Sequence, residues 1–137
     1  MSMKSKIISG YARRWPRSVL DMVREDGKPF PSVRKELSKK GVYVLYRGSV
    51  PYYIGRSEVN LYTRICDHNQ PEDDYYNFWD YFSIIVVSAK ELVKDVEAVL
   101  IVSMPDAANR SEPRGRIPLP DEVVEALRKR QIIKCDH

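Results

Sequence analysis

The sequence has 137 residues, the length of one small domain, and we expect a single domain over residues 1–137. Hydrophobic residues make up 43% of it and charged residues 31%, which is typical of a soluble globular fold and excludes a disordered polar chain. It has no run of about 18 apolar residues, so no membrane helix is expected. The cysteines, Cys66 and Cys135, are too few for a disulfide framework, which favours a reducing, cytoplasmic location.

The net charge is +4, and the basic residues are clustered. Residues 1–20 contain five Lys or Arg and no acid, and further clusters lie at 34–40, 110–116 and 128–134. Such clustering suits a polyanion such as nucleic acid, because each neutralised phosphate releases counterions. It also suits Lys and Arg that only solvate helix ends and tails, so the charge alone leaves both interpretations open.

The N-terminal part of the sequence favours two short helices. Pro16 suits a first helical turn, and the apolar stripe that follows it predicts a helix over residues 16–26. A second helix, with Ser32 as its N-cap, is expected over residues 32–38. We therefore expect residues 1–37 to form a helical, basic extension.

The clearest strands are residues 41–47 and 50–55, which are separated by the dipeptide Gly-Ser. Both are rich in β-branched and aromatic residues, and a short glycine-containing connection between such runs predicts a hairpin. They are apolar at nearly every position, so we expect both faces of the sheet to be covered. Pro51 has no backbone N–H to donate, which favours an edge position for the second strand.

The remaining predicted elements are a helix, a strand and two further helices, at 58–69, 78–88, 91–104 and 121–133. Ser88 and Glu91 have the spacing of a capping box at the start of the third of these elements. The complete order predicts an α+β fold, with a small three-stranded central sheet flanked by helices.

Glu97 lies within the apolar sector of the helix predicted over residues 91–104. A charged side chain in that position costs several kcal/mol unless a cation or hydrogen-bond donors meet it. Two interpretations follow: a carboxylate at the rim of the stripe that reaches water or pairs with an Arg, or a ligand for a hard divalent cation such as Mg²⁺.

Arg64 and His68 are spaced i, i+4 on the helix predicted over 58–69, so they share one face of it at the border of its apolar stripe. Together they suit an anion site with a proton-transfer group beside it. Taken alone, each also fits an ordinary role, as an Arg whose charged end reaches water and as a surface His.

In combination, these positions resemble the GIY-YIG nuclease family. The elements that carry the resemblance are Gly41-Val42-Tyr43, Tyr53-Ile54-Gly55, a basic Arg56, Arg64-x-x-x-His68, Glu97 and Asn109. Val42 stands where the family usually has Ile, a mild departure. The resemblance covers roughly residues 38–115, the expected nuclease core, and leaves the N-terminal extension and a C-terminal helical segment, 116–137, outside it.

The resemblance implies a metal-dependent phosphodiesterase that cuts nucleic acid, usually DNA, and leaves a 3′-hydroxyl and a 5′-phosphate. It implies that Glu97 holds the single cation, Mg²⁺ or Mn²⁺, and that Asn109 fixes a side chain or loop of the active site by hydrogen bonds. It also implies a three-stranded central sheet, in agreement with the elements predicted above.

The implied chemistry needs a base, and we expect Tyr43 to be that base and Tyr53 to orient the water or the phosphate, although these roles can be exchanged. A phenolate at pH 7 costs roughly 4 kcal/mol. We expect cations at Arg56, Arg64 and the metal to offset this cost by lowering the pKa of the phenol. Arg64 and Arg56 also suit phosphate binding, and His68 suits proton relay or a phosphate contact.

The expected partner is nucleic acid, double-stranded or branched DNA in particular, with roles in DNA repair, structure-selective cleavage or restriction. A homo-oligomer and a subunit that needs a partner both stay open. The alternative function is a non-catalytic nucleic-acid-binding or partner-binding module on the same fold.

Overall fold

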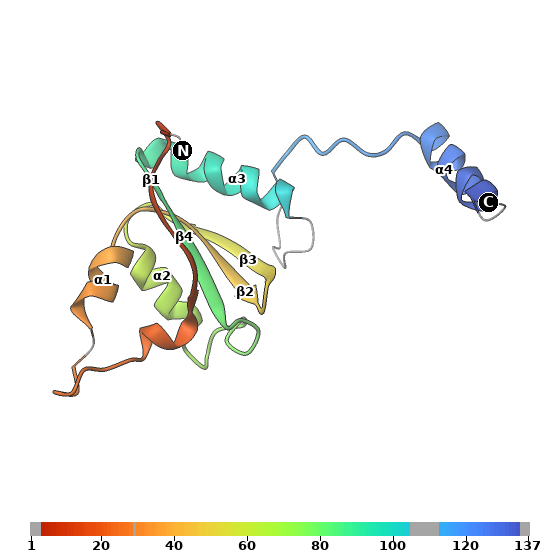
Figure 1. The fold of residues 1–137 in the computed structure, drawn as a ribbon. Helices are drawn as coiled ribbons and strands as arrows, with labels where there is room; N and C mark the ends of the chain where they lie inside the picture. The colour runs from red at the N-terminus through yellow and green to blue at the C-terminus, as the bar shows by residue number, and fades with distance from the viewer. Residues whose placement is uncertain (1–3, 29, 105–112, 135–137) are drawn as a thin grey trace.

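The computed structural model describes residues 4–28, 30–104 and 113–134, and its centre is an antiparallel sheet (Figure 1). The strands are β1 (Ile8–Pro16), β2 (Gly41–Arg47), β3 (Val50–Ser57) and β4 (Tyr81–Val87). They lie in the order β1-β4-β2-β3, and every neighbouring pair is antiparallel. The α+β class is confirmed, but the sheet has four strands and not three.

The additional strand is β1, in a segment for which the sequence predicts only helices. It pairs with β4 at the sheet edge, and its register shifts twice along the pairing. Its residues are mostly exposed and include two adjacent arginines, so no alternation of apolar and polar residues marks it as a strand. The helix predicted over 16–26 is wrong: Arg17–Leu20 form one 3₁₀ turn, and Met22 and Val23 are exposed.

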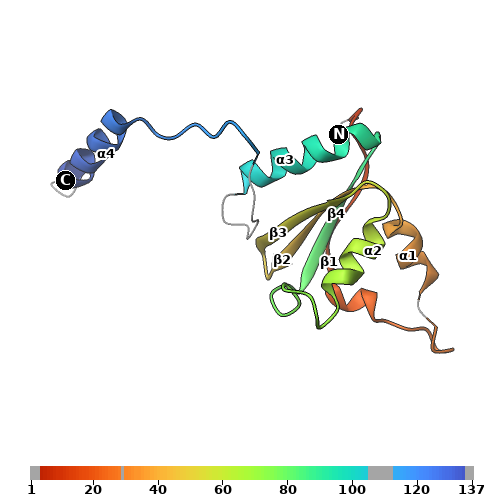
Figure 2. The same cartoon turned by 180° about the vertical axis from the view of Figure 1, so that it is seen from behind.

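Helices cover both faces of the sheet (Figures 1 and 2). On one face lie α1 (Pro31–Leu37) and α2 (Leu61–His68). On the other lies α3 (Val93–Ser103), which follows the 3₁₀ turn Lys90–Leu92. The alternation of β2 explains this layering, because Tyr43 and Leu45 belong to the core beneath α2 while Val42 and Val44 belong to the core beneath α3.

Two predicted helix caps are wrong. The first helix begins at Pro31 with Phe30 as its N-cap, so Ser32 lies inside it. The N-cap of the turn that follows is Ala89 and not Ser88, whose hydroxyl instead donates to the carbonyl of Lys6, because β1 runs beside this end of β4. A contact from 82 residues away along the chain has replaced the local capping box.

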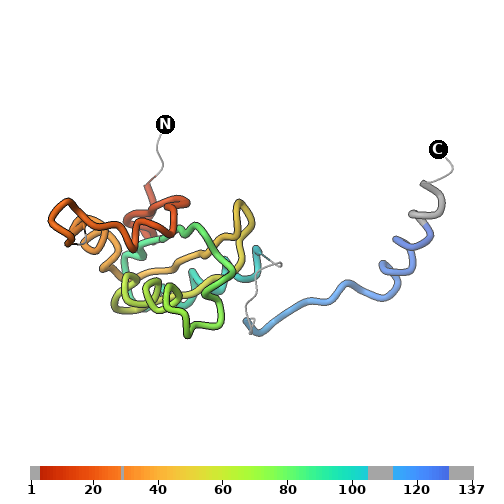
Figure 3. Tube along the Cα trace, turned by 90° about the horizontal axis from the view of Figure 1, so that it is seen from below, coloured from red at the N-terminus to blue at the C-terminus, as the bar shows by residue number. Residues whose placement is uncertain are grey.

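The last helix, α4 (Asp121–Lys134), lies away from the sheet at the end of an extended stretch of chain (Figures 1 and 3). Its position in the sequence agrees with the helix predicted over 121–133. Val123 and Leu127 on α4 are exposed. None of the described helices has the length and apolar character that a bilayer crossing requires.

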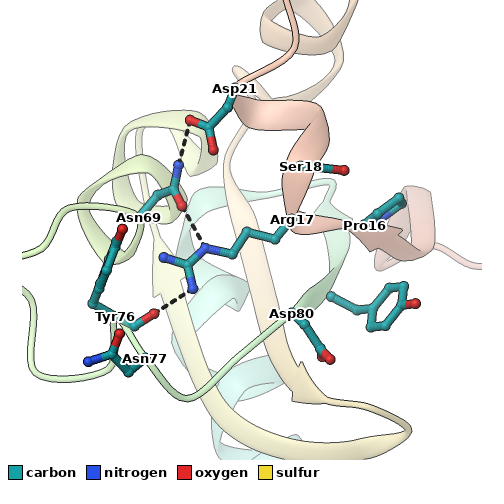
Figure 4. A pocket seen from close by; sticks show the side chains of 9 residues that line it. Pro16, Arg17, Ser18, Asp21, Asn69, Tyr76, Asn77 and Asp80 are labelled. Carbon is teal, nitrogen blue, oxygen red and sulfur yellow. Dashed lines mark hydrogen bonds between the residues drawn. The ribbon is translucent and has the colours of Figure 1, made fainter.

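Arg17 joins the N-terminal segment to the loop between α2 and β4 (Figure 4). Its guanidinium donates to the side-chain oxygen of Asn69 and to the backbone carbonyls of Tyr76 and Trp79. Its charge also lies 4.3 Å from the centre of the Trp79 ring, and burial lowers its pKa. The side-chain amide of Asn69 in turn donates to the carboxylate of Asp21, so a further hydrogen bond joins the N-terminal segment to the end of α2.

Candidate active site

A pocket of about 400 Å³ lies at the open edge of β3, where α2 and α3 extend past the sheet from opposite faces. It is lined by Tyr53, Ile54, Arg56, Arg64, His68, Asp73, Asp74, Tyr75, Glu97 and Ile101. Five of the seven residues predicted for the site therefore face one cavity. Tyr43 lies behind the wall of the pocket, in contact with His68, and Asn109 lies outside the described residues.

The hairpin register brings the two tyrosines together. Tyr43 pairs with Gly55 and Leu45 pairs with Tyr53, so the tyrosines are diagonal neighbours on one face, with ring centres 6.2 Å apart. The Tyr43 ring crosses directly over Gly55, where an added Cβ would lie 2.2 Å from the phenol oxygen. Only glycine leaves room for this ring, which is the physical reason for a glycine two residues after Tyr53.

Tyr43 is completely buried, and its hydroxyl lies 2.7 Å from Nε2 of His68. Burial raises the pKa of Tyr43 well above the usual range, and Tyr53 and Glu97 raise it further. The Arg64 cation acts in the opposite direction but does not reverse the shift. Arg64 therefore lowers this pKa as expected, but it does not offset the cost of removing the phenol from water, so the pKa of Tyr43 stays raised.

His68 connects the buried phenol to a carboxylate. Its side chain is 5% exposed, and Nδ1 lies 2.9 Å from Oδ2 of Asp73. The same oxygen accepts the backbone N–H of Tyr75 at 2.9 Å. Asp73 and Tyr75 come from the acidic, aromatic loop after α2, to which the sequence analysis assigned no function. The only signal available was a carboxylate five residues after the histidine.

Tyr53 differs from Tyr43 in that its ring lines the pocket. It stacks on Tyr75 with ring centres 4.5 Å apart, and the edge of His68 meets it at 5.3 Å. Burial and the neighbouring Tyr75 raise the pKa of Tyr53 as well, so neither phenol is held as a phenolate by the surrounding side chains.

Glu97 and Arg56 form an ion pair across the gap between α3 and β3. Nη1 of Arg56 donates to Oε1 of Glu97 at 2.5 Å, and the carboxylate is only 14% exposed. This agrees with the interpretation in which the carboxylate in the apolar stripe pairs with an Arg. The pair also gives Arg56 a defined partner other than the two tyrosines.

Arg64 projects from α2 into the pocket with about half of its side chain exposed. It forms an ion pair with Asp67, one turn further along the helix, at 3.7 Å. At this distance the pairing is loose, and a surface ion pair contributes about 0–1 kcal/mol. The guanidinium also interacts with the Tyr43 hydroxyl by hydrogen bonding, and an anion that enters the pocket would compete for the same donors.

The donor set suits a hard cation that keeps most of its water. Glu97 brings one carboxylate to the pocket, and its bond to Arg56 uses only one of the two oxygens. Mg²⁺ binds through one or two carboxylates together with waters and substrate phosphates, so a single carboxylate fits it. Within the described residues no cluster of three or more His, Cys, Asp or Glu side chains is arranged to bind a metal, so a closed all-protein cage is absent there.

Among the comparisons with known proteins, the one with solved structures finds matches. No protein-family model matches the sequence, and no curated protein matches it. The structure is similar to that of the GIY-YIG N-terminal endonuclease domain of UvrC from Thermotoga maritima, bound to its catalytic divalent cation, magnesium. The sequence identity is 25%, the match covers 56% of this chain and 93% of that domain, and the TM-score is 0.45.

An asparagine-to-alanine point mutant of the same domain, bound to the catalytic cation, also matches, with 25% identity, 56% and 92% coverage and a TM-score of 0.43. The fold is similar to that of a GIY-YIG endonuclease domain. These TM-scores lie below 0.5, so the likeness by itself assigns no function to the pocket.

Proposed function

We propose that this protein is a metal-dependent endonuclease that hydrolyses phosphodiester bonds in DNA. The observation that carries the proposal is the convergence of Glu97, Arg64, His68 and Tyr53 on one cavity at the edge of β3, with Tyr43 bonded to His68 directly behind it. Phosphodiester hydrolysis requires a carboxylate that holds a metal ion, a cationic side chain that binds the phosphate, and a chain of groups that accept the proton of the attacking water.

Glu97 would hold the divalent cation, Mg²⁺ or Mn²⁺, which would act as a Lewis acid on a phosphate oxygen and on the leaving 3′-oxygen. Arg64 binds the same phosphate through its planar donor pair. Arg56 keeps the Glu97 carboxylate oriented at the pocket through their ion pair.

Tyr43 acts as a base without first becoming a phenolate. The water gives a proton to the Tyr43 oxygen while Tyr43 passes its own proton to Nε2 of His68, at 2.7 Å. The oxygen of the water forms a bond to phosphorus, and the bond from phosphorus to the 3′-oxygen breaks. The 3′-oxygen leaves with the electron pair and takes a proton from solvent. His68 ends the step as an imidazolium.

This role requires water to reach a hydroxyl that is buried in the free protein. Tyr53 and Arg64 form the nearest part of the pocket wall, and we expect a bound phosphate to move Arg64 and admit the water. Tyr53, which already faces the pocket, orients that water in this scheme. If Tyr43 stays closed to water, the exchanged assignment holds, with Tyr53 as the base.

The test is nicking of supercoiled plasmid with Mg²⁺ or Mn²⁺, with and without EDTA. We expect cleavage that depends on the metal and that Glu97→Gln abolishes. A panel of plasmid, flap, branched DNA, single strand and RNA then assigns the substrate and separates repair, structure-selective and restriction roles. Absence of cleavage on every substrate would rule out the endonuclease.

A second candidate function has one observation in its favour. Arg56 already forms an ion pair with Glu97, as expected if this carboxylate has a purely structural role in a binding module. Such a module would bind DNA equally well with and without Mg²⁺ and would not cut it. Electrophoretic mobility shifts alongside the nicking assay distinguish the two functions.

A further inference from the structure

We propose that Asp73 is a positioning residue for the reaction: it fixes the protonation of His68 so that Nε2 is free to take the proton of Tyr43. This inference rests on the proposed function for its catalytic consequence. Its structural part, the tautomer of His68, stands on the hydrogen bonds alone.

The direction of each hydrogen bond follows from its partners. An ionised carboxylate only accepts, so Asp73 requires Nδ1 of His68 to carry the hydrogen of the 2.9 Å bond. A neutral imidazole has one N–H, which leaves Nε2 as an acceptor. The partner of Nε2, at 2.7 Å, is the phenol of Tyr43, which must therefore donate. Because the hydrogen of Tyr43 points at His68, the lone pairs of the Tyr43 oxygen are available to accept a proton from another group.

Asp73 is itself held in place. Its Oδ2 accepts the backbone N–H of Tyr75 as well as the His68 hydrogen. The ring N–H of Trp79 donates to the carbonyl of His68 at 3.2 Å, which ties the end of the loop back to α2. Arg17 holds the same loop by donating to the carbonyl of Tyr76 (Figure 4) and to the carbonyl of Trp79. The carboxylate therefore meets His68 from a fixed position.

The chemical consequence appears when the proton moves. As Tyr43 gives its proton to Nε2, His68 becomes a cation in a nearly buried position, where an isolated charge is costly. The Asp73 carboxylate, 2.9 Å away, stabilises that cation and keeps its own negative charge. Asp73 does not touch the reacting atoms.

The two charged neighbours of His68 on α2 do not substitute for Asp73. Arg64 lies on the same helix as His68 and lines the same pocket, but a guanidinium has no acceptor for the hydrogen of Nδ1. Asp67 precedes His68 directly, yet it pairs with Arg64, and its side chain is 56% exposed. Asp67→Asn is therefore the matched control, with the same change of charge one residue from His68.

The first measurement needs no activity. The chain has two histidines, so long-range proton–nitrogen NMR spectra can assign His68 by comparison with a His68→Gln variant. We expect the Nδ1–H tautomer in the wild type and in Asp67→Asn, and its loss or mixing in Asp73→Asn. An Nε2–H tautomer in the wild type, or an unchanged tautomer in Asp73→Asn, overturns the inference.

The second measurement is single-turnover cleavage at saturating protein. We expect Asp73→Asn to slow cleavage by about 10²–10⁴-fold, the range of general acid–base catalysis, with DNA affinity unchanged. Asp73→Glu should recover part of the rate. In a His68→Gln background, Asp73→Asn should slow cleavage no further, because the carboxylate acts through the imidazole.

The possible failures can be told apart. A wild type that cuts while Asp73→Asn cuts equally fast overturns the positioning role, and so does a full additional loss in the His68→Gln background. A wild type that does not cut, but shows the expected tautomer, rules out the endonuclease and leaves the orientation of His68 by Asp73 intact.

Discussion

Replacing Tyr43 by Phe removes one buried hydroxyl and leaves the ring that fills the space over Gly55. The change breaks the 2.7 Å bond to His68 and leaves Nε2 without that partner. An unsatisfied buried acceptor costs about 1–3 kcal/mol. Small domains are stable by about 5–15 kcal/mol, so we expect Tyr43→Phe to fold with a modestly lower melting temperature.

The expected loss of activity is larger than the loss of stability. General acid–base groups contribute about 10²–10⁴-fold, equivalent to about 2.7–5.4 kcal/mol of activation free energy. A free phenol is ionised in only about one molecule in a thousand at pH 7, and burial makes the Tyr43 phenolate rarer still. The rate therefore depends on transfer of the proton to His68, and Phe cannot take part in that transfer.

The assay is single-turnover nicking with saturating protein, together with DNA binding in Ca²⁺ as a measure of affinity. Tyr53→Phe is the matched control, since its ring stacks on Tyr75 whether or not it carries a hydroxyl. We expect Tyr43→Phe to bind DNA normally and to lose cleavage. If Tyr43→Phe cuts within threefold of the wild type while Tyr53→Phe is inactive, the pocket-facing phenol is the base and the relay through His68 is refuted.

Three further predictions concern stability and metal dependence. Burial raises the pKa of Tyr43 above its unfolded value of about 10, so its contribution to folding stability is fully present below that pH and falls above it by up to about 1.4 kcal/mol per pH unit. Thermal melts from pH 8 to 11 should therefore show a smaller decline in melting temperature for Tyr43→Phe than for the wild type. An identical decline would contradict the raised pKa. Gly55→Ala should lose about 1–3 kcal/mol in denaturant unfolding because its methyl meets the Tyr43 phenol, whereas Gly10→Ala, with its nearest contact at 3.9 Å, should lose less; equal losses would show that the contact is relieved easily. Arg56→Gln should lower the Mg²⁺ concentration for half-maximal nicking if Arg56 only neutralises Glu97, and a loss of maximal rate with an unchanged requirement for Mg²⁺ would instead assign Arg56 to the phosphate.

The parts of the site that sequence reasoning predicted are those set by local spacing. Strand alternation and a short turn fix Tyr43 and Tyr53 on one face of the hairpin, and helical spacing fixes Arg64 and His68 on one face of α2. The apolar stripe around Glu97 indicated that this carboxylate needs a cation, and Arg56 supplies one. Each of these relations depends on a repeat that can be read within a few residues.

The parts that were missed depend on contacts between distant segments. β1 is a strand because β4 offers it an edge, and its own exposed, basic residues do not indicate one. The helix predicted over 16–26 yields to a single turn because Arg17 is drawn into the loop after α2. Asp73 gains its role from that loop, which accepts hydrogen bonds from Arg17, a residue more than fifty positions earlier in the chain.

Arg17 and Asp73 together connect the N-terminal segment to the chemistry of the candidate site. The expected nuclease core begins near residue 38. The Asp73 carboxylate, which orients His68, lies on a loop that is held by Arg17, and Arg17 lies outside that core. Sheet pairing alone would place β1 at the edge farthest from the pocket, with no influence on it. The guanidinium of Arg17 changes this, because it follows directly at the end of β1 and reaches the loop that lines the pocket. The segment before residue 38 is thus a supporting part of the site, and its effect on catalysis passes through the position of one loop.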